Sequence, residues 1–303
     1  MTMSSTLDWY GCSTFCFKTA GLSIFLDAYI DRPSGADGTG LSASDVQQAD
    51  WVLIGHSHFD HLYGAEEIIR NTNAKLIGSY ESVRVMEAAG VPIDRMICVQ
   101  GGEYIDLGNG VKVRVYPSQH SCVWSHLGMV QPDTQCIGDL GVTWQEQQAA
   151  MQRLNSYLAQ ETSDAVRMHL AESASGHSKR GDGGALVFLV EAPDGSLLFK
   201  DTSGHWSGVL EGLRPDVAIL AAAGRGNIDG QPIQGSLCEF LAKEVEHLQP
   251  STIFLSHHDN WLPGFSVATD TRSIVESIRK VSPETLVIEP GYLESTELFV
   301  AQA

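Results

Sequence analysis

The chain has 303 residues, of which 43% are hydrophobic and 18% are charged, so it can bury a substantial core and shows no sign of bulk disorder. Its formal net charge is −18, from 37 acidic and 19 basic residues. A surface this acidic repels nucleic-acid phosphates and anionic membranes, so both are disfavoured as partners. No apolar run approaches the roughly 18 to 20 residues that a membrane span needs.

The N-terminal residues and the cysteines bear on the compartment. The first residues lack the basic and apolar stretches of a secretory signal. The six cysteines are scattered, without a CxxC pair or a dense framework, which is typical of free thiols in a reducing compartment. We therefore expect a cytoplasmic protein.

Short apolar and β-branched runs separated by turns dominate the first third of the chain. They predict strands at residues 7–11, 14–20, 22–28, 51–55, 75–79 and 110–118. Residues 63–72 and 80–90 have the apolar spacing of helices, and Gly90 is a suitable residue to end the second one.

Residues 121–183 interrupt this pattern. The segment is polar, contains one convincing helix at residues 142–161, and ends in the loose, Gly- and Ser-rich stretch 172–184. About 60 residues form only a marginal core by themselves. We therefore interpret the segment as an insertion, a helical cap on a single domain that spans residues 1–303.

After this insertion the alternation of strands and helices resumes. Strands are predicted at residues 185–192, 196–201, 217–223, 252–256 and 285–290. Residues 235–249 and 269–281 have the periodicity of amphipathic helices. Two strand-rich halves with helices between the strands predict a layered α/β protein.

Four polar side chains crowd the end of one predicted strand. The apolar run 51–55 is followed by HSHFDH at residues 56–61, a cluster that would be costly there unless it bound something. Imidazole and carboxylate are the usual nitrogen and oxygen ligands of zinc and its first-row neighbours. His56 and His58 are two residues apart, so in extended chain they point to one side and can share a cation. Asp60 and His61 lie where the chain should turn into a helix, so they can face a neighbouring cation.

Three further predicted strands end in a residue of the same type. His120 follows the strand at 110–118, Asp201 ends the strand at 196–201, and His257 and His258 follow the strand at 252–256. Each of these residues, taken alone, is more often a capping, turn or solvated residue. Beside the HSHFDH cluster, their shared position predicts that distant segments converge on a metal site at one sheet edge.

HSHFDH, followed in order by a histidine, an aspartate and a last histidine, each after a strand, resembles the metallo-β-lactamase-fold superfamily over nearly the whole chain. The opening sequence LDWYGCSTFCFKTAGLSIFLDAY resembles the branch that holds ascorbate-6-phosphate lactonase and N-acyl phosphatidylethanolamine phospholipase D. The resemblance implies a four-layer αββα sandwich with the metals at one edge, between the sheets. That branch often has a histidine where this chain has Cys12, so the role of that histidine is not carried over.

The same resemblance implies two divalent metal ions, most readily zinc, with manganese or iron as alternatives. His56, His58 and His120 would hold the first, Asp60, His61 and His257 the second, and Asp201 would bridge them. His257 is chosen over His258 because HHDN resembles the family's final His-x-Asp run. Asp27 resembles a buried family aspartate that orients the ligands.

Such a centre is suited to hydrolysis. Two cations about 3.5 to 4 Å apart lower the pKa of a shared water toward neutrality, and the resulting hydroxide attacks a carbonyl carbon or phosphorus. Asp60 would hold this nucleophile, while His258, or else His205 or His177, could protonate a leaving group. Relatives with a di-iron centre tend to carry glutamate at the position of His58, so this histidine favours a zinc-type hydrolytic site.

Aromatic residues near the proposed ligands suggest a substrate pocket. Trp124, Trp206 and Trp261 each lie within five residues of a ligand, and Tyr63 follows HSHFDH closely. Buried aromatics are as often core as pocket, but together these favour a site for an apolar or aromatic group. Arg225 could bind a carboxylate or phosphate, or could be a solvated residue of a glycine turn.

Three functions remain open at this point. The first is hydrolysis of a small-molecule ester, lactone or amide, the second is phosphodiester hydrolysis at the same centre, and the third is metal binding or sensing without catalysis. A small-molecule substrate is the expected partner, and a homo-oligomer is possible.

Overall fold

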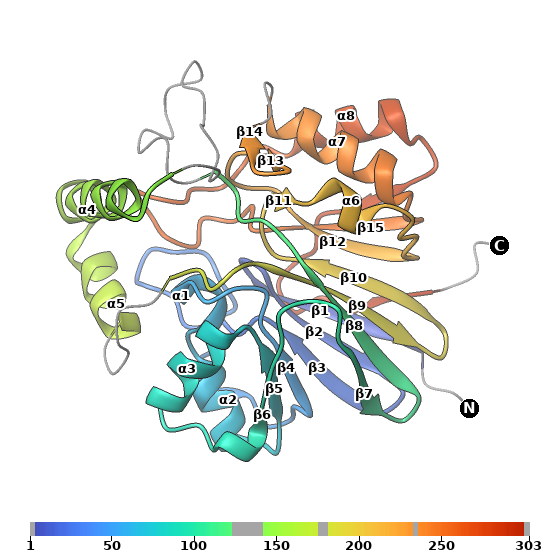
Figure 1. Ribbon diagram of the computed structural model, residues 1–303, viewed down its shortest axis with the longest axis horizontal. Helices are drawn as coiled ribbons and strands as arrows, with labels where there is room; N and C mark the ends of the chain where they lie inside the picture. The colour runs from blue at the N-terminus through green and yellow to red at the C-terminus, as the bar shows by residue number, and fades with distance from the viewer. Residues whose placement is uncertain (1–3, 123–141, 175–180, 233–235, 300–303) are drawn as a thin grey trace.

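The computed structural model describes residues 4–122, 142–174, 181–232 and 236–299. In these parts of the chain, two large β-sheets lie face to face, and each has helices on its outer side (Figure 1). The layered α/β architecture expected from the sequence, an αββα sandwich, is confirmed.

The first sheet has the strand order β17-β1-β2-β3-β4-β5-β6. Its first four strands in this order are antiparallel, and β3 to β6 are parallel. The bounds are β1 (Thr6–Gly11), β2 (Thr14–Thr19), β3 (Leu22–Leu26), β4 (Trp51–Leu53), β5 (Lys75–Gly78), β6 (Met96–Cys98) and β17 (Thr296–Glu297).

The second sheet has the order β16-β15-β12-β10-β9-β8-β7. Here β7 to β10 are antiparallel, whereas β10, β12, β15 and β16 are parallel. The bounds are β7 (Tyr104–Gly108), β8 (Val111–Pro117), β9 (Leu186–Ala192), β10 (Gly195–Lys200), β12 (Val217–Ala221), β15 (Thr252–Ser256) and β16 (Leu286–Ile288). A small third sheet joins β11 (Gly204–His205), β13 (Asn227–Ile228) and β14 (Gln231–Pro232).

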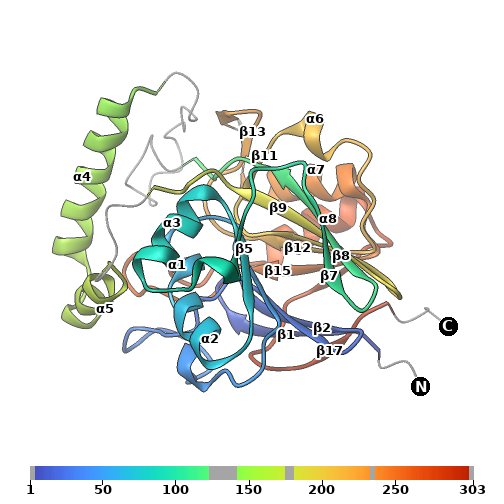
Figure 2. The same cartoon turned by 60° about the horizontal axis from the view of Figure 1, so that its bottom comes forward.

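Helices cover the outer faces of both large sheets. α1 (Phe59–Leu62), α2 (Ala65–Asn71) and α3 (Tyr80–Ala88) lie on the first sheet, whereas α6 (Ser207–Leu210), α7 (Leu237–Leu248) and α8 (Arg272–Val281) lie on the second (Figures 1 and 2). Short 3₁₀ turns occur at Ala43–Asp45 and Ile93–Arg95.

Alternation along the strands divides the core into three layers. In β2, Phe15 and Phe17 point between the sheets and meet Phe199 of β10, while Cys16 points outward toward α2 and α3. The side chains of β3 alternate in the same way, and Phe25 lies on the outer side of the first sheet. Since side chains in a strand alternate in direction, strands that are apolar on both faces read as continuous apolar runs.

The described part of the insertion forms two helices at one end of the sandwich, α4 (Trp144–Glu161) and α5 (Asp164–Ala174) (Figures 1 and 2). The predicted helix at 142–161 is confirmed; it starts at a capping box in which Thr143 Oγ accepts from Glu146 N–H and the Glu146 carboxylate accepts from Thr143 N–H. α5 was not predicted. It is held by tertiary contacts, because its His169 Nε2 lies 2.8 Å from the buried Tyr29 hydroxyl.

Six of the described strands were also not predicted from the sequence: β6, β7 and the two-residue strands β11, β13, β14 and β17. β6 has three residues, and β7 is mostly exposed or half-buried, so neither shows the apolar run used to recognise strands. Among the described residues, no helix is both long enough and apolar enough to span a membrane.

Candidate metal centre

The parallel strands of the two sheets bring the predicted ligands together. Lys200 of β10 pairs with Leu220 of β12, and Ala221 pairs with Ser256 of β15, so the segments that begin with Asp201 and His257 leave the second sheet side by side. β4 ends at Leu53 in the facing sheet, shortly before His56. The carboxyl ends of these strands therefore deliver polar side chains to one edge, where parallel sheets commonly form binding sites.

Three histidines form the first cluster of potential metal ligands. One ring nitrogen from each of His56, His58 and His120 lies within 4.8 Å of the others. The ring centroids are 4.7 to 4.8 Å apart and the rings are tilted edge to face. Three imidazoles that face one another in this way are suited to hold a cation.

A second cluster contains Asp60 and His257. The Asp60 Oδ2 atom lies 3.3 Å from His257 Nε2 and 3.4 Å from His61 Nε2. The indole N–H of Trp261 donates to His257 Nδ1 at 3.1 Å and fixes this ring. The Cys12 thiol also lies within 4.8 Å of the ligand atoms of Asp60 and His257, although the sequence analysis gave it no role.

Asp201 lies between these clusters. Its Oδ2 atom is 2.6 Å from His56 Nδ1 and 3.2 Å from His61 Nδ1. Its Oδ1 atom is buried and has no hydrogen-bond partner among the described residues. A buried carboxylate oxygen without a donor is costly, which leaves a place for a cation.

Asp27, the buried aspartate expected from the sequence to orient the ligands, lies in hydrogen-bond contact with His61. Its Oδ2 atom accepts from His61 Nδ1 at 2.6 Å and from the Ser13 hydroxyl at 2.7 Å, and its Oδ1 atom accepts from Gly55 N–H at 2.9 Å. The hydrogen bond to Nδ1 directs His61 Nε2 toward Asp60. Ser13 was missed, because a serine in a turn carries no signal by itself.

The electrostatics of the cluster favour bound cations. Burial lowers the pKa of His56 to about 4, with the positive charge of His61 adding to this effect. Burial and the neighbouring rings of His56 and His120 also lower the pKa of His58 well below its ordinary value. Both rings are therefore neutral at pH 7, the protonation state that a metal ligand needs.

The carboxylates of the site remain ionised. Burial raises the pKa of Asp60 and Asp201, but nearby histidines outweigh this effect, and both values end below the ordinary one. His61 shows the opposite balance: burial lowers its pKa, but the charges of Asp60, Asp27 and Asp201 raise it well above the ordinary value. Three buried carboxylates around one histidine create a negative potential that divalent cations would neutralise. The donor set therefore fits the binding of divalent cations.

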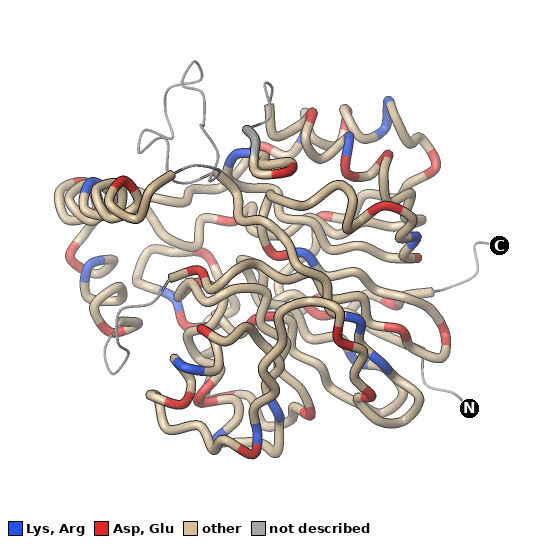
Figure 3. The backbone as a smooth tube through the Cα atoms, viewed as in Figure 1, with Lys and Arg blue, Asp and Glu red and all other residues tan. Residues whose placement is uncertain are grey.

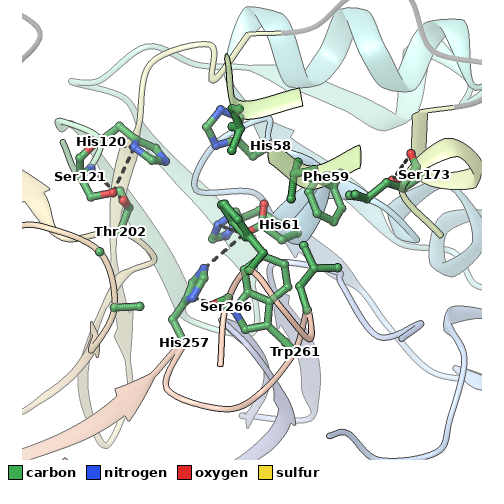
Figure 4. A pocket seen from close by; sticks show the side chains of 18 of the residues that line it. His58, Phe59, His61, His120, Ser121, Ser173, Thr202, His257, Trp261 and Ser266 are labelled. Atoms are coloured by element: carbon green, nitrogen blue, oxygen red, sulfur yellow. Dashed lines mark hydrogen bonds and ion pairs between the residues drawn. The ribbon is translucent and has the colours of Figure 1, made fainter. Parts of the chain in front are cut away.

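The site opens into a cavity of about 390 Å³. His58 and His61 reach it from one segment of the chain, and His120 and His257 reach it from two others (Figure 4). Trp261, which was predicted to lie near the substrate, lines the cavity as well. The cap supplies much of the remaining wall through α4 and α5, so the insertion covers the candidate metal centre.

Other predicted substrate residues are not among the described residues that line this cavity. Tyr63 packs against His169 of the cap, with ring centroids 5.8 Å apart. Trp206 precedes α6, and the backbone carbonyl of Arg225 accepts from Cys122 N–H. Trp124 lies outside the described residues.

His258 was predicted to protonate a leaving group, but the structure does not bring it to the cavity. Its ring stacks on Trp9 with centroids 4.9 Å apart and planes 6° apart. Of the other two histidines considered for this role, His205 lies beside Glu244, with His205 Nδ1 3.2 Å from Glu244 Oε1. His177 lies outside the described residues.

A family model described as "Beta-lactamase superfamily domain" matches residues 6–231. The UPF0173 metal-dependent hydrolase of Pyrobaculum arsenaticum is 31% identical over 118 residues, which cover 37% of this chain and 49% of that protein. The chain thus spans about half the length of the curated relatives it matches.

Solved structures show the same fold. Igni18, a metallo hydrolase from Ignicoccus hospitalis, aligns with a TM-score of 0.60 and 17% identity over 98% of this chain and 100% of its own. CmlA, a diiron beta-hydroxylase from Streptomyces venezuelae, aligns with a TM-score of 0.59 and 14% identity over 98% of this chain and 55% of its own. Likeness at these identities establishes the fold and leaves the chemistry to be argued from the site. Since the family model covers more than half of the sequence and the ligand-type residues converge at the edge between the sheets, the chain belongs to the beta-lactamase superfamily.

Proposed function

We propose that this protein is a metal-dependent hydrolase that cleaves a small-molecule ester, lactone or amide at a dinuclear metal centre. The observation that carries the proposal is the convergence of His56, His58 and His120 on one side of Asp201, and of Asp60, His61 and His257 on the other. Six of these seven residues, all except His56, line one cavity, and they come from four separate segments of the chain.

Divalent ions held by these residues would supply Lewis acidity and a water of lowered pKa. The protein's own residues set the geometry: Asp27 holds His61, Trp261 holds His257, and the ionised Asp60 faces both rings. Asp60 could accept a hydrogen bond from the attacking water and orient it toward the substrate carbonyl.

The nitrogen-rich donor set supports zinc over harder metals, with manganese and iron as alternatives. The opening sequence, residues 7–29, supports a place in the branch with ascorbate-6-phosphate lactonase and N-acyl phosphatidylethanolamine phospholipase D. A cytoplasmic location is supported by the described cysteines, all of which are free: Cys12, Cys16, Cys98, Cys122 and Cys238.

Activity profiling tests the proposal. The zinc-loaded protein is assayed with p-nitrophenyl acetate, a γ-lactone, a p-nitroanilide and bis(p-nitrophenyl) phosphate. Turnover of a carbonyl substrate that is lost in Asp201→Ala supports the proposal. Turnover of the phosphodiester alone identifies a phosphodiesterase, and full metal occupancy without any turnover identifies a non-catalytic metal-binding protein; either result contradicts it.

A further inference from the structure

The cap presents a row of apolar side chains to the cavity. Along α4, the lining residues recur at the spacing of a single helix face and are listed here: Ala150, Met151, Leu154, Asn155 and Leu158. Met151, Leu154 and Leu158 are only half-buried, and each of them lines the cavity. Apolar surface left facing a cavity is a recurrent mark of ligand-binding sites.

A second wall is apolar as well. Phe59, Trp261, Leu262 and Phe265 line the cavity and pack in one hydrophobic cluster with Val166 and Leu170 of α5 (Figure 4 labels the first two). The metal-ligating side chains form its floor. The cavity is therefore a chamber with apolar walls above a polar reaction centre, and about 390 Å³ is within the range of sites for small organic ligands.

The residues that line the cavity restrict the charge that the non-reacting part of the substrate can carry. None of the described lining residues is a lysine or an arginine, and the two acidic ones, Asp60 and Asp201, lie at the floor. An anionic tail would lose its hydration without gaining a cationic partner in these walls. Asn155, Ser173 and Ser266 provide a few polar groups, which can orient a neutral substrate.

Resting on the hydrolase activity proposed above, we propose that the cap selects a neutral substrate by an apolar acyl or aryl group that packs against α4. The reacting carbonyl would lie over the metal-ligating residues, and the apolar group would lie between Leu154 and the aromatic wall. The insertion thus sets the substrate class, while the sandwich sets the reaction.

Ligand binding tests the proposal without any catalysis. Binding of octanamide and acetamide to the metal-free protein is measured by isothermal titration calorimetry. Each buried methylene strengthens binding about fourfold, so burying three of the six additional methylenes gives octanamide roughly 60-fold tighter binding. Equal affinities for the two amides would overturn the proposal.

A matched pair of variants locates the effect. Leu154→Asp places a carboxylate in the apolar wall, and we expect it to weaken octanamide binding about tenfold while leaving acetamide binding unchanged. Gln152→Asp makes the same change in charge at an exposed residue of α4 that does not line the cavity, and we expect no effect. If both variants weaken octanamide binding equally, α4 does not form the selective wall. Leu158→Asp replaces Leu154→Asp if the latter does not fold.

Turnover separates this proposal from the one on which it rests. In the zinc-loaded wild type, p-nitrophenyl octanoate should exceed p-nitrophenyl acetate in kcat/KM, and Leu154→Asp should remove most of that preference. Selective octanamide binding without ester turnover would contradict the hydrolase function and leave the apolar site intact. Ester turnover without any preference for the longer chain would contradict the apolar site alone.

Discussion

Gly55 lies where the chain passes closest to Asp201. A Cβ atom at this position would come within 2.1 Å of Asp201 Oδ2, much closer than any non-bonded contact allows. The absence of a side chain therefore lets the segment that follows β4 approach Asp201, which lies between the two ligand clusters. Gly55 also donates its N–H to the carboxylate of Asp27. This one glycine therefore positions two of the three buried carboxylates, Asp27 and Asp201.

Gly55→Ala should displace Asp201, since both it and Gly55 are buried and neither can move without strain. We expect a loss of about 1 to 3 kcal/mol in the free energy of unfolding, and a lower metal content. Denaturant titration of the metal-free protein and elemental analysis measure the two effects. Gly208→Ala is the matched control, because its Cβ atom would meet nothing within 4 Å. Unchanged stability and metal content in Gly55→Ala would contradict this account.

Single residues differ in how far the sequence could predict them. HSHFDH was recognisable because its ligands are adjacent in the chain. The choice between His257 and His258 depends on backbone conformation: His257 has φ of +62°, and the two rings contact different neighbours. Asp60 interacts with His257, whereas His258 stacks on Trp9. No local pattern encodes that turn.

At the scale of elements, a buried charge cluster joins α7 to the segment that carries Asp201. Lys200 Nζ lies 3.1 Å from Glu244 Oε1 and also donates to the Thr202 carbonyl. His205 Nδ1 lies beside the same Glu244 carboxylate. Burial raises the pKa of Glu244, but Lys200 and His205 outweigh this and lower it. Asp201 lies between two residues that this cluster fixes.

Glu244→Ala should destabilise the protein strongly, because it leaves the fully buried Lys200 without its counter-charge. The expected loss is about 3 to 5 kcal/mol in the free energy of unfolding, measured by denaturant titration. Glu246→Ala, at an exposed position of the same helix, should change it by less than about 0.5 kcal/mol. Equal, small losses in the two variants would show that the cluster contributes nothing to stability.

The cap is anchored by the hydrogen bond between the Tyr29 hydroxyl and His169 Nε2. Burial lowers the pKa of His169 to about 4, with the charge of Arg32 adding to this effect and that of Glu172 opposing it. Unfolded histidine has a pKa of about 6.5. Between these values the unfolded chain binds more protons than the folded one, so this contribution to stability is complete above about pH 6.5 and is lost as the pH falls toward 4.

We therefore expect the wild type to lose more stability between pH 7 and pH 5 than His169→Gln does. Denaturant titrations of the metal-free proteins at both pH values measure the difference, and comparing the two proteins cancels the contribution of the remaining histidines. An equal loss in both proteins would mean that His169 is not held neutral by the folded structure.

Helices and strands with a strong apolar pattern in their own sequence were predictable. Those that depend on contacts with distant parts of the chain were not. The central strands are apolar on both faces, so β9, β10, β12 and β15 stand out in the sequence. By contrast, α5 is fixed by its contact with Tyr29, more than 130 residues away, and residues 164–174 were not recognised as a helix. Its contribution to the cavity through Leu170 and Ser173 was hidden for the same reason.

At the scale of the molecule, the sandwich provides the sheet edge at which the candidate metal ligands converge. The insertion provides the helices α4 and α5, which cover that edge. The acidic positions are spread over both halves of the described backbone rather than gathered on one face (Figure 3). The order of ligand-type residues after strands predicted the fold, but the sequence could not predict that α4 would lie over the metal centre. That placement depends on how residues 142–174 pack against the rest of the chain.

The central claim is that remote residues gather around two cations, and metal content tests it most directly. Elemental analysis of protein purified without added metal should give about two equivalents per chain. His120→Ala and Asp201→Ala should each bind less, because each removes a side chain from a different part of the buried cluster, whereas Asp8→Ala in β1, where Asp8 pairs with Lys18, should keep full occupancy. A metal-free wild type that stays empty after dialysis against zinc, or full occupancy in both ligand variants, would contradict the account.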